Sequence, residues 1–188
     1  MPARRRPSPE ARLADAALRA LAKKAWREIS LAEIARAAKL PLAELPSLAP
    51  AKPALIGLVL RRLGDEVAKR FKPDGEAQSA RDRLFDVGKA WFDVLSRHKP
   101  AIRSLYAGLK GDPVTLVAVR GAIVASAEWL MTLAEADKGP ALSLRAAGFA
   151  AVLGRAMSVW LDDDRDLTKT MARLDGDLRR GESLLDRL

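Results

Sequence analysis

The chain has 188 residues, a length that fits one domain or two small domains with a buried core. It has no cysteine, which excludes disulfides and thiolate metal sites and favours a reducing, cytoplasmic location, and its single histidine, His98, argues against a zinc site or a Ser-His-Asp triad. The formal net charge is +9, and residues 1–72 hold 16 Lys and Arg against 7 Asp and Glu, whereas residues 73–188 hold 17 of each. This division predicts that the N-terminal part meets a polyanion, either nucleic acid or an anionic membrane face.

The residue pattern predicts an all-α protein, because Ala, Leu and Arg dominate and β-branched residues are few. Residues 1–9 contain three prolines and three arginines and are predicted to form a disordered arm. Ser30 followed by Glu33 forms a capping-box pattern at the start of a short helix. Apolar periodicity and the Pro and Gly breaks predict about nine helices, at residues 10–25, 31–38, 42–48, 53–71, 80–97, 100–109, 113–136, 142–161 and 167–188.

The polar stretch at residues 72–79 is the predicted boundary between two modules. Residues 10–72 would form the first module, and residues 80–188 a larger helical bundle. No apolar run approaches the ~20 residues that span a bilayer, so no transmembrane segment is expected.

The first module has the layout of a helix-turn-helix domain, with a tight turn between its second and third helices. Its spacing resembles that of the TetR family of transcriptional regulators over about 30 residues without a gap. The residues that carry the resemblance are Trp26, Ser30, Leu31, Ile34, Ala35, Ala38, Leu40, Leu45, Lys52 and Leu55. A small helical bundle without a role in DNA binding is the alternative interpretation.

The recognition helix departs from the family pattern. Lys39 and Ala43 stand where the family often has glycine, Pro46 replaces the usual Tyr, and Ala49 replaces the usual Phe. The segment has no Arg, Asn or Gln for bidentate base contacts, and Pro46 is expected to shorten or kink it.

The resemblance implies that Ser30 and Lys52 contact DNA phosphates. An arginine-rich arm enters the minor groove or neutralises phosphates in such proteins, although it could equally be a solubilising terminus. The candidate DNA-binding residues are Arg4, Arg5, Arg6, Ser30, Lys39, Leu42 and Lys52.

In the family that the chain resembles, the second module holds a ligand cavity and the dimer contact. The candidate pocket for an apolar effector is lined by Trp91, Phe92, Tyr106, Trp129 and Met131, with ordinary core packing as the alternative. The small residues of 142–161 allow close helix contact and suggest a homodimer, with packing inside one chain as the alternative. The candidate interface residues are Ala147, Ala151, Gly154, Leu174 and Leu178.

The acidic run Asp162, Asp163 and Asp164, followed by Asp166, is interpreted as capping of the next helix and not as a metal site. No nucleophile–base pair, phosphate loop or metal ligand set is present, so neither an enzyme nor a cofactor is expected.

The stretch from Trp160 to Asp166, with Thr170 and Asp175, also resembles a family of TetR-like accessory proteins of ubiquinone biosynthesis. Those proteins bind lipids and have lost DNA binding, which offers a second explanation of the altered recognition helix and of the basic surface. The favoured interpretation is a dimeric, ligand-responsive repressor that binds double-stranded DNA, and the alternative is a lipid-binding accessory protein.

Overall fold

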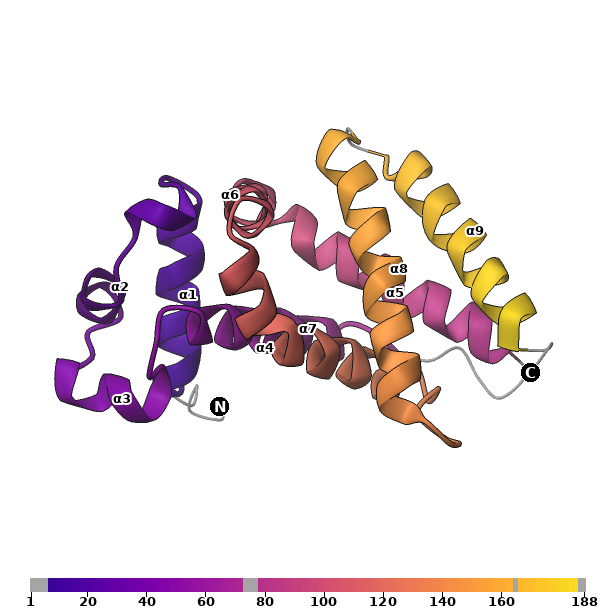
Figure 1. Ribbon diagram of the computed structural model, residues 1–188, viewed down its shortest axis with the longest axis horizontal. Helices are drawn as coiled ribbons and strands as arrows, with labels where there is room; N and C mark the ends of the chain where they lie inside the picture. The colour runs from indigo at the N-terminus through magenta and orange to yellow at the C-terminus, as the bar shows by residue number, and fades with distance from the viewer. Residues whose placement is uncertain (1–6, 73–77, 164–165, 186–188) are drawn as a thin grey trace, which may run out of the picture. The chain divides into compact units, whose positions relative to one another are not determined.

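A computed structural model describes residues 7–72, 78–163 and 166–185, with side chains described as far as residue 181. Within these residues the chain is all-helical, as the sequence predicts (Figure 1). The α-helices are α1 (Pro9–Leu21), α2 (Leu31–Ala37), α3 (Leu45–Leu48), α4 (Ala54–Ala68), α5 (Ala80–Ser96), α6 (Lys99–Lys110), α7 (Pro113–Leu133), α8 (Leu142–Asp162) and α9 (Thr168–Leu185). Two 3-10 helices, η1 (Trp26–Glu28) and η2 (Leu42–Glu44), complete the order.

Short polar side chains cap the starts of α1 and α2, and the cap at Ser30 is the one that the sequence predicts. Ser8 accepts a hydrogen bond from the Ala11 amide at the start of α1, and Ser30 accepts one from the Glu33 amide at the start of α2. The Glu33 carboxylate binds Lys24 at 2.5 Å, and this contact, with help from the Ser30 amide, lowers the pKa of Glu33. The capping box at Ser30 therefore also connects α2 to the end of α1.

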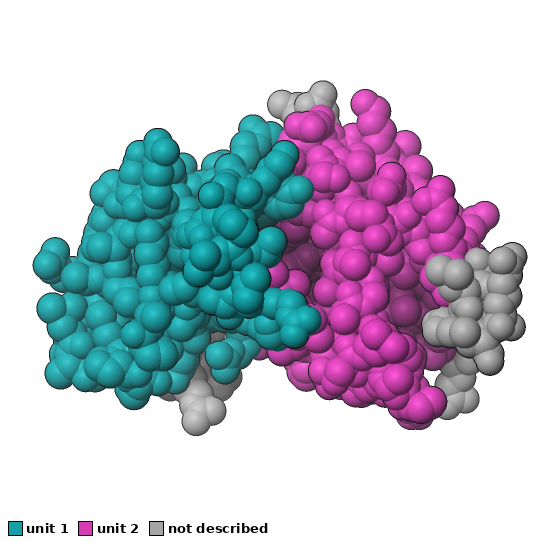
Figure 2. All heavy atoms as spheres, viewed as in Figure 1, with its two compact units in different colours: residues 1–62, 98–122 teal, residues 63–97, 123–188 magenta. Residues whose placement is uncertain are grey.

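The chain divides into two compact units, and the division is not sequential (Figure 2). Unit 1 consists of residues 1–62 and 98–122, and unit 2 of residues 63–97 and 123–188. The sequence predicts one boundary at residues 72–79, whereas α6 and the first part of α7 belong to the same unit as the N-terminal helices. The contacts of α6 with α1 and η1 explain the difference. The helices α4 and α7 each contribute residues to both units.

Unit 1 is built around α1, which packs against α2 and α6. Leu13, Ile34 and Leu55 are fully buried and come from α1, α2 and α4 respectively. The hydroxyl of Ser104 on α6 donates to the Lys24 carbonyl at 2.8 Å, just after α1 ends. Because residues 98–122 belong to unit 1, four cations of α6 and α7 are part of this unit. Unit 1 holds 17 Lys and Arg against 6 Asp and Glu, a net charge of +11.

Unit 2 is a helical bundle in which α9 packs against α8 and α5. Trp160 and Phe92 are fully buried, with ring centroids 6.1 Å apart, and the Trp160 indole N–H donates to Ser96 Oγ at 3.2 Å. Asp163 is buried and accepts hydrogen bonds from both the amide and the hydroxyl of Thr170, each at 2.8 Å, which caps the start of α9. Unit 2 holds 16 Lys and Arg against 18 Asp and Glu, a net charge of −2.

The helices α7 and α8 are each long and apolar enough to cross a membrane by length and composition. Single charged residues such as Arg120 interrupt them, which is why no long uncharged run is visible in the sequence. In each helix 28% of the most apolar window is buried inside the structure. Core helices of soluble proteins have the same length and composition, so these two helices are weak evidence for a membrane span. The absence of a transmembrane segment stays a prediction.

Candidate nucleic-acid interface

The turn between α2 and η2 is a Schellman motif, in which two amides return to the carbonyls of the helix. The Leu40 amide donates to the Ala35 carbonyl at 2.9 Å, and the Lys39 amide donates to the Arg36 carbonyl at 3.0 Å. Lys39 has a φ of 56°, the left-handed conformation that glycine adopts most easily. The position where the resemblance expects glycine is therefore left-handed in this chain as well, although it carries a lysine.

The recognition segment, residues 42–48, is divided into η2 and the four-residue helix α3. Pro46 lies in the first turn of α3, where its missing amide costs no helical hydrogen bond. Leu42 is 51% exposed, and Ala43, Glu44, Pro46 and Ser47 are exposed as well. This surface is short and mostly apolar, as the sequence analysis expected, so it has little capacity for hydrogen-bonded base readout.

The candidate DNA-binding residues outside the recognition segment differ in their exposure to solvent. Ser30 and Lys39 are exposed at the start and just after the end of α2, where a phosphate could reach them. The Ser30 hydroxyl oxygen accepts from Glu33, which leaves its proton to donate. The arm residues Arg4, Arg5 and Arg6 lie outside the described residues.

Lys52 turns into unit 1, in contrast to the outward orientation that a phosphate contact requires. Its Nζ donates to the Trp26 carbonyl at 2.6 Å and lies 4.5 Å from the centroid of the Trp26 ring. Burial lowers the pKa of Lys52, and the nearby Asp112 carboxylate only partly opposes this shift. Lys52 therefore connects the turn before α4 to η1, and its ammonium is only partly available to DNA.

Unit 1 carries further exposed cations that the acids of the unit do not neutralise. Lys24 pairs with Glu33 at 2.5 Å, and Arg62 pairs with Asp15 at 2.8 Å. Eight exposed cations of unit 1 form no ion pair with the described residues: Arg19, Lys23, Arg27, Arg36, Lys39, Arg61, Lys110 and Arg120. The sequence alone does not indicate that the cations of α6 join the basic N-terminal part, because nothing local in residues 99–110 shows that this helix packs against α1.

The five candidate pocket residues differ in burial and belong to both units. Trp91, Phe92 and Met131 are buried core residues of unit 2, whereas Trp129 is 42% exposed and lies against Gly64. Tyr106 belongs to α6 of unit 1 and is half-buried. Core packing therefore accounts for three of the five, and Trp129 is the residue in unit 2 that remains accessible to a ligand.

The candidate dimer residues fall on two different faces. Ala147 is half-buried, and Ala151 and Gly154 are exposed on α8, where a Cβ on Gly154 would meet no described atom within 4 Å. Leu174 and Leu178 are buried within the chain on α9, so their side chains are not available to a second copy. Leu174 packs against α5, where its Cδ2 lies 2.8 Å from the position of an ideal Cβ on Gly88.

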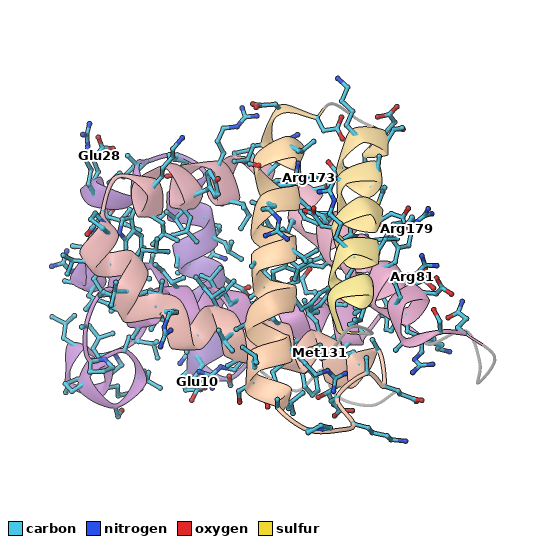
Figure 3. The ribbon with its side chains drawn as sticks, turned by 45° about the vertical axis from the view of Figure 1, so that its right-hand side comes forward. Glu10, Glu28, Arg81, Met131, Arg173 and Arg179 are labelled. Carbon is cyan, nitrogen blue, oxygen red and sulfur yellow. The ribbon has the colours of Figure 1, made fainter. Side chains whose placement is uncertain are left out.

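A cluster of three arginines surrounds Asp177 where α8 and α9 meet. Asp177 is 3% exposed and accepts hydrogen bonds from Arg155 of α8 and from Arg173 and Arg180 of α9, at 2.9–3.1 Å. Arg173 lies on the side of α9 toward α8, and Arg179 projects from the other side (Figure 3). Burial acts to raise the pKa of Asp177, but the hydrogen bonds from Arg155 and Arg173 outweigh it, and the pKa is lowered.

No family model and no curated protein matches the sequence. Among solved structures, a TetR transcriptional regulator from Rhodococcus sp. RHA1 is 17% identical with a TM-score of 0.68, over 91% of this chain and 93% of that chain. A TetR transcriptional regulator from Nitrosomonas europaea is 16% identical with a TM-score of 0.65, over 93% and 98%. A TetR-family regulator from Streptomyces coelicolor is 24% identical with a TM-score of 0.52, over 90% and 78%. The chain therefore has the all-helical fold of TetR-type transcriptional regulators.

Proposed function

We propose that the protein is a DNA-binding transcriptional regulator that holds the duplex through unit 1. The observation that carries the proposal is an exposed helix-turn-helix in a unit whose net charge is +11. A protein that neutralises phosphates with Lys and Arg releases counterions, and this supplies most of the affinity of many DNA-binding proteins. The three similar solved structures named above are transcriptional regulators, which favours this function over the lipid-binding alternative.

Sequence discrimination in this proposal comes mainly from DNA shape and deformability. The exposed side chains of residues 42–48 include one charged residue, Glu44, which a phosphate would repel. Leu42 offers an apolar contact of the kind that reads a thymine methyl group. We therefore expect a small ratio of specific to non-specific affinity together with a steep dependence on salt.

A salt titration of duplex binding tests the proposal. Fluorescence anisotropy with a labelled duplex of about 30 base pairs should show tight binding near ~50 mM salt, and affinity should fall by about 10³ or more by ~200 mM if six or more phosphates are neutralised. The Arg36→Ala change, in the last turn of α2, should reduce the slope by about one unit, whereas Arg179→Ala on unit 2 should leave it unchanged. Absence of binding at ~50 mM salt, with a folded protein, would contradict the proposal.

The regulatory part of the proposal concerns unit 2 and dimerisation. We propose that the chain forms a homodimer through the face of α8 that carries Ala147, Ala151 and Gly154. We also propose that an apolar ligand beside Trp129 shifts the relative populations of two dimer geometries. A ligand that favours a half-site spacing different from that of the operator lowers DNA affinity, which is how such a dimer acts as a repressor. The test is duplex affinity measured with and without an uncharged apolar probe, N-phenyl-1-naphthylamine, for the wild type and for Trp129→Ala. Equal effects of the probe on the two proteins would contradict a ligand site at Trp129.

A further inference from the structure

Unit 1 contains a cavity of about 490 Å³ whose walls come from four segments of the chain. These segments are η1, the turn before α4, the end of α6 and the first turn of α7. The volume lies in the range of small-molecule sites in proteins. The lining residues are Trp26, Arg27, Lys52, Pro53, Ala107, Gly108, Gly111, Asp112 and Thr115. None of them is among the residues that the sequence analysis assigned to a ligand pocket.

One wall of the cavity carries two cations. Arg27 is exposed in η1, and within the described residues its guanidinium forms no ion pair. Lys52 donates one N–H to the Trp26 carbonyl, and an ammonium has two more to give. Burial of Lys52 disfavours its charged form, so an anion in the cavity would restore stabilisation that the surroundings only partly supply.

The single acid of the lining is already used by the protein. Asp112 accepts hydrogen bonds from the Thr115 amide at 3.0 Å and from the Thr115 hydroxyl at 2.6 Å, which lower its pKa and cap the start of α7. Its carboxylate therefore stays ionised but is held by its own helix. The formal charge of the lining is +1, and the cationic donors still available to a ligand are those of Arg27 and Lys52.

The remaining walls of the cavity are apolar, and there the backbone of α6 lies close to η1. An ideal Cβ on Gly108 would lie 2.5 Å from Trp26 Cβ, so only glycine lets α6 come this close to η1. Pro53 and Ala107 add apolar surface. An anion without an apolar body would leave this surface in contact with water.

We propose that this cavity is a binding site for a small organic anion, a carboxylate or a phosphate ester. Its charged group lies between Arg27 and Lys52, and its apolar body lies against Pro53 and Ala107. The site belongs to the DNA-binding unit and is separate from the apolar ligand site proposed for unit 2. It does not depend on DNA binding, so its test needs no DNA.

The test follows the indole N–H signals of the full-length protein by two-dimensional NMR. The chain has four tryptophans, and the Trp26 signal is assigned by its loss in Trp26→Phe or from backbone connectivities. Benzoate and phenyl phosphate serve as probes, with sodium chloride added to match ionic strength. We expect a saturable shift of the Trp26 signal with one or both probes, and no saturable shift of the Trp91, Trp129 and Trp160 signals, which report on unit 2. Saturation by benzoate alone identifies a carboxylate ligand, and saturation by phenyl phosphate alone identifies a phosphate ester.

Charge variants separate the site from general electrostatics. Arg27→Ala should weaken probe binding by about tenfold or more, because a charge-assisted hydrogen bond is lost, and Arg27→Lys should restore part of it. Lys23→Ala removes an exposed cation that is not in the lining and should leave the affinity unchanged. The proposal is overturned if neither probe saturates the Trp26 signal, or if Arg27→Ala and Lys23→Ala weaken binding equally.

Discussion

Lys39 adopts a left-handed backbone conformation that costs an L-residue about 1–2 kcal/mol, yet it also places a positive charge just beyond α2. The two effects act on different equilibria. The strain lowers the free energy of unfolding, whereas the charge acts on the complex with DNA. A lysine at a position where glycine would fold more easily is a local conflict of the kind found at functional sites.

The Lys39→Gly variant should therefore be more stable and bind DNA less well. We expect the free energy of unfolding to rise by about 0.5–1 kcal/mol, because relief of strain exceeds the extra entropy of glycine in the unfolded chain. Duplex affinity should fall, with a salt slope smaller by about one unit. Lys39→Ala is the control, since it removes the charge and keeps the Cβ: it should lose affinity without gaining stability. Urea unfolding and fluorescence anisotropy measure the two quantities, and a loss of stability in Lys39→Gly would contradict the strain argument.

At the level of elements, the contact between η1 and α6 decides which helices belong to unit 1. Gly108 lets α6 approach Trp26, and Ser104 bonds to the Lys24 carbonyl one turn earlier. Neither residue is distinctive in the sequence, because a glycine in a helix and an exposed serine are both common. The contact could only be found once the two segments were placed together.

Gly108→Ala should be strongly destabilising for a change of one methyl group. The new Cβ would lie 2.5–3.0 Å from three Trp26 atoms that are held in place by Lys52, so either η1 or α6 must move. We expect a loss of about 1–3 kcal/mol in the free energy of unfolding, measured with urea. Gly121→Ala on α7 is the matched control, since its Cβ would meet nothing within 4 Å, and it should stabilise by about 0.5–1 kcal/mol. Equal effects of the two changes would show that the close approach is not required.

The Asp177 cluster connects α8 to α9 and should make stability depend on pH. A carboxyl whose pKa is lower in the folded protein contributes stability above its unfolded pKa, near ~3.9, and this contribution disappears as pH falls through the folded pKa. Asp177→Asn should be less stable than the wild type by about 1–2 kcal/mol at pH 7, and the difference should shrink as pH falls below about 4. Asp175→Asn is the control, because Asp175 is half-exposed and pairs only with Arg179, so its change should cost less than about 0.5 kcal/mol. Thermal unfolding from pH 3 to 7 measures both, and a difference independent of pH would contradict this role of the charge.

At the scale of the whole molecule, the helices could be predicted from the sequence because their signals are local. Ser30 caps α2, the helix that its capping-box pattern indicates, and apolar periodicity predicts most helix ends within about three residues. The assignment of faces could not be predicted in the same way. Leu174 and Ala151 both read as interface residues, but one is in the core and the other is exposed, because small and large apolar residues occur on more than one face of these helices.

The grouping of α6 with unit 1 also depends on contacts between distant segments, and it changes the meaning of the charge. Counted along the sequence, residues 73–188 are neutral. Counted by structural unit, residues 98–122 add a net charge of +3 to unit 1 and residues 63–72 add +1 to unit 2, which leaves unit 1 with +11 and unit 2 with −2. The surface that we propose to bind DNA is thus larger than residues 1–72 indicate. The affinity of this surface for DNA depends on whether one or two copies of unit 1 bind the same duplex.

Ala151→Arg tests whether two copies do so. Ala151 is exposed beside Gly148 and Gly154, where an added Cβ meets no described atom within 4 Å, so an arginine should leave the fold of one chain intact. If α8 packs against α8 of a second copy, the same arginine brings two large cations into one symmetric contact and should convert the dimer to a monomer in sedimentation. Duplex affinity should then fall by about 100-fold or more, because the second half-site is no longer bound at high effective concentration. The added positive charge alone would raise affinity for DNA, so the predicted loss cannot come from electrostatics. Ala118→Arg adds the same charge to an exposed alanine of unit 1 and should leave the dimer unchanged, and a dimeric Ala151→Arg protein would place the contact elsewhere.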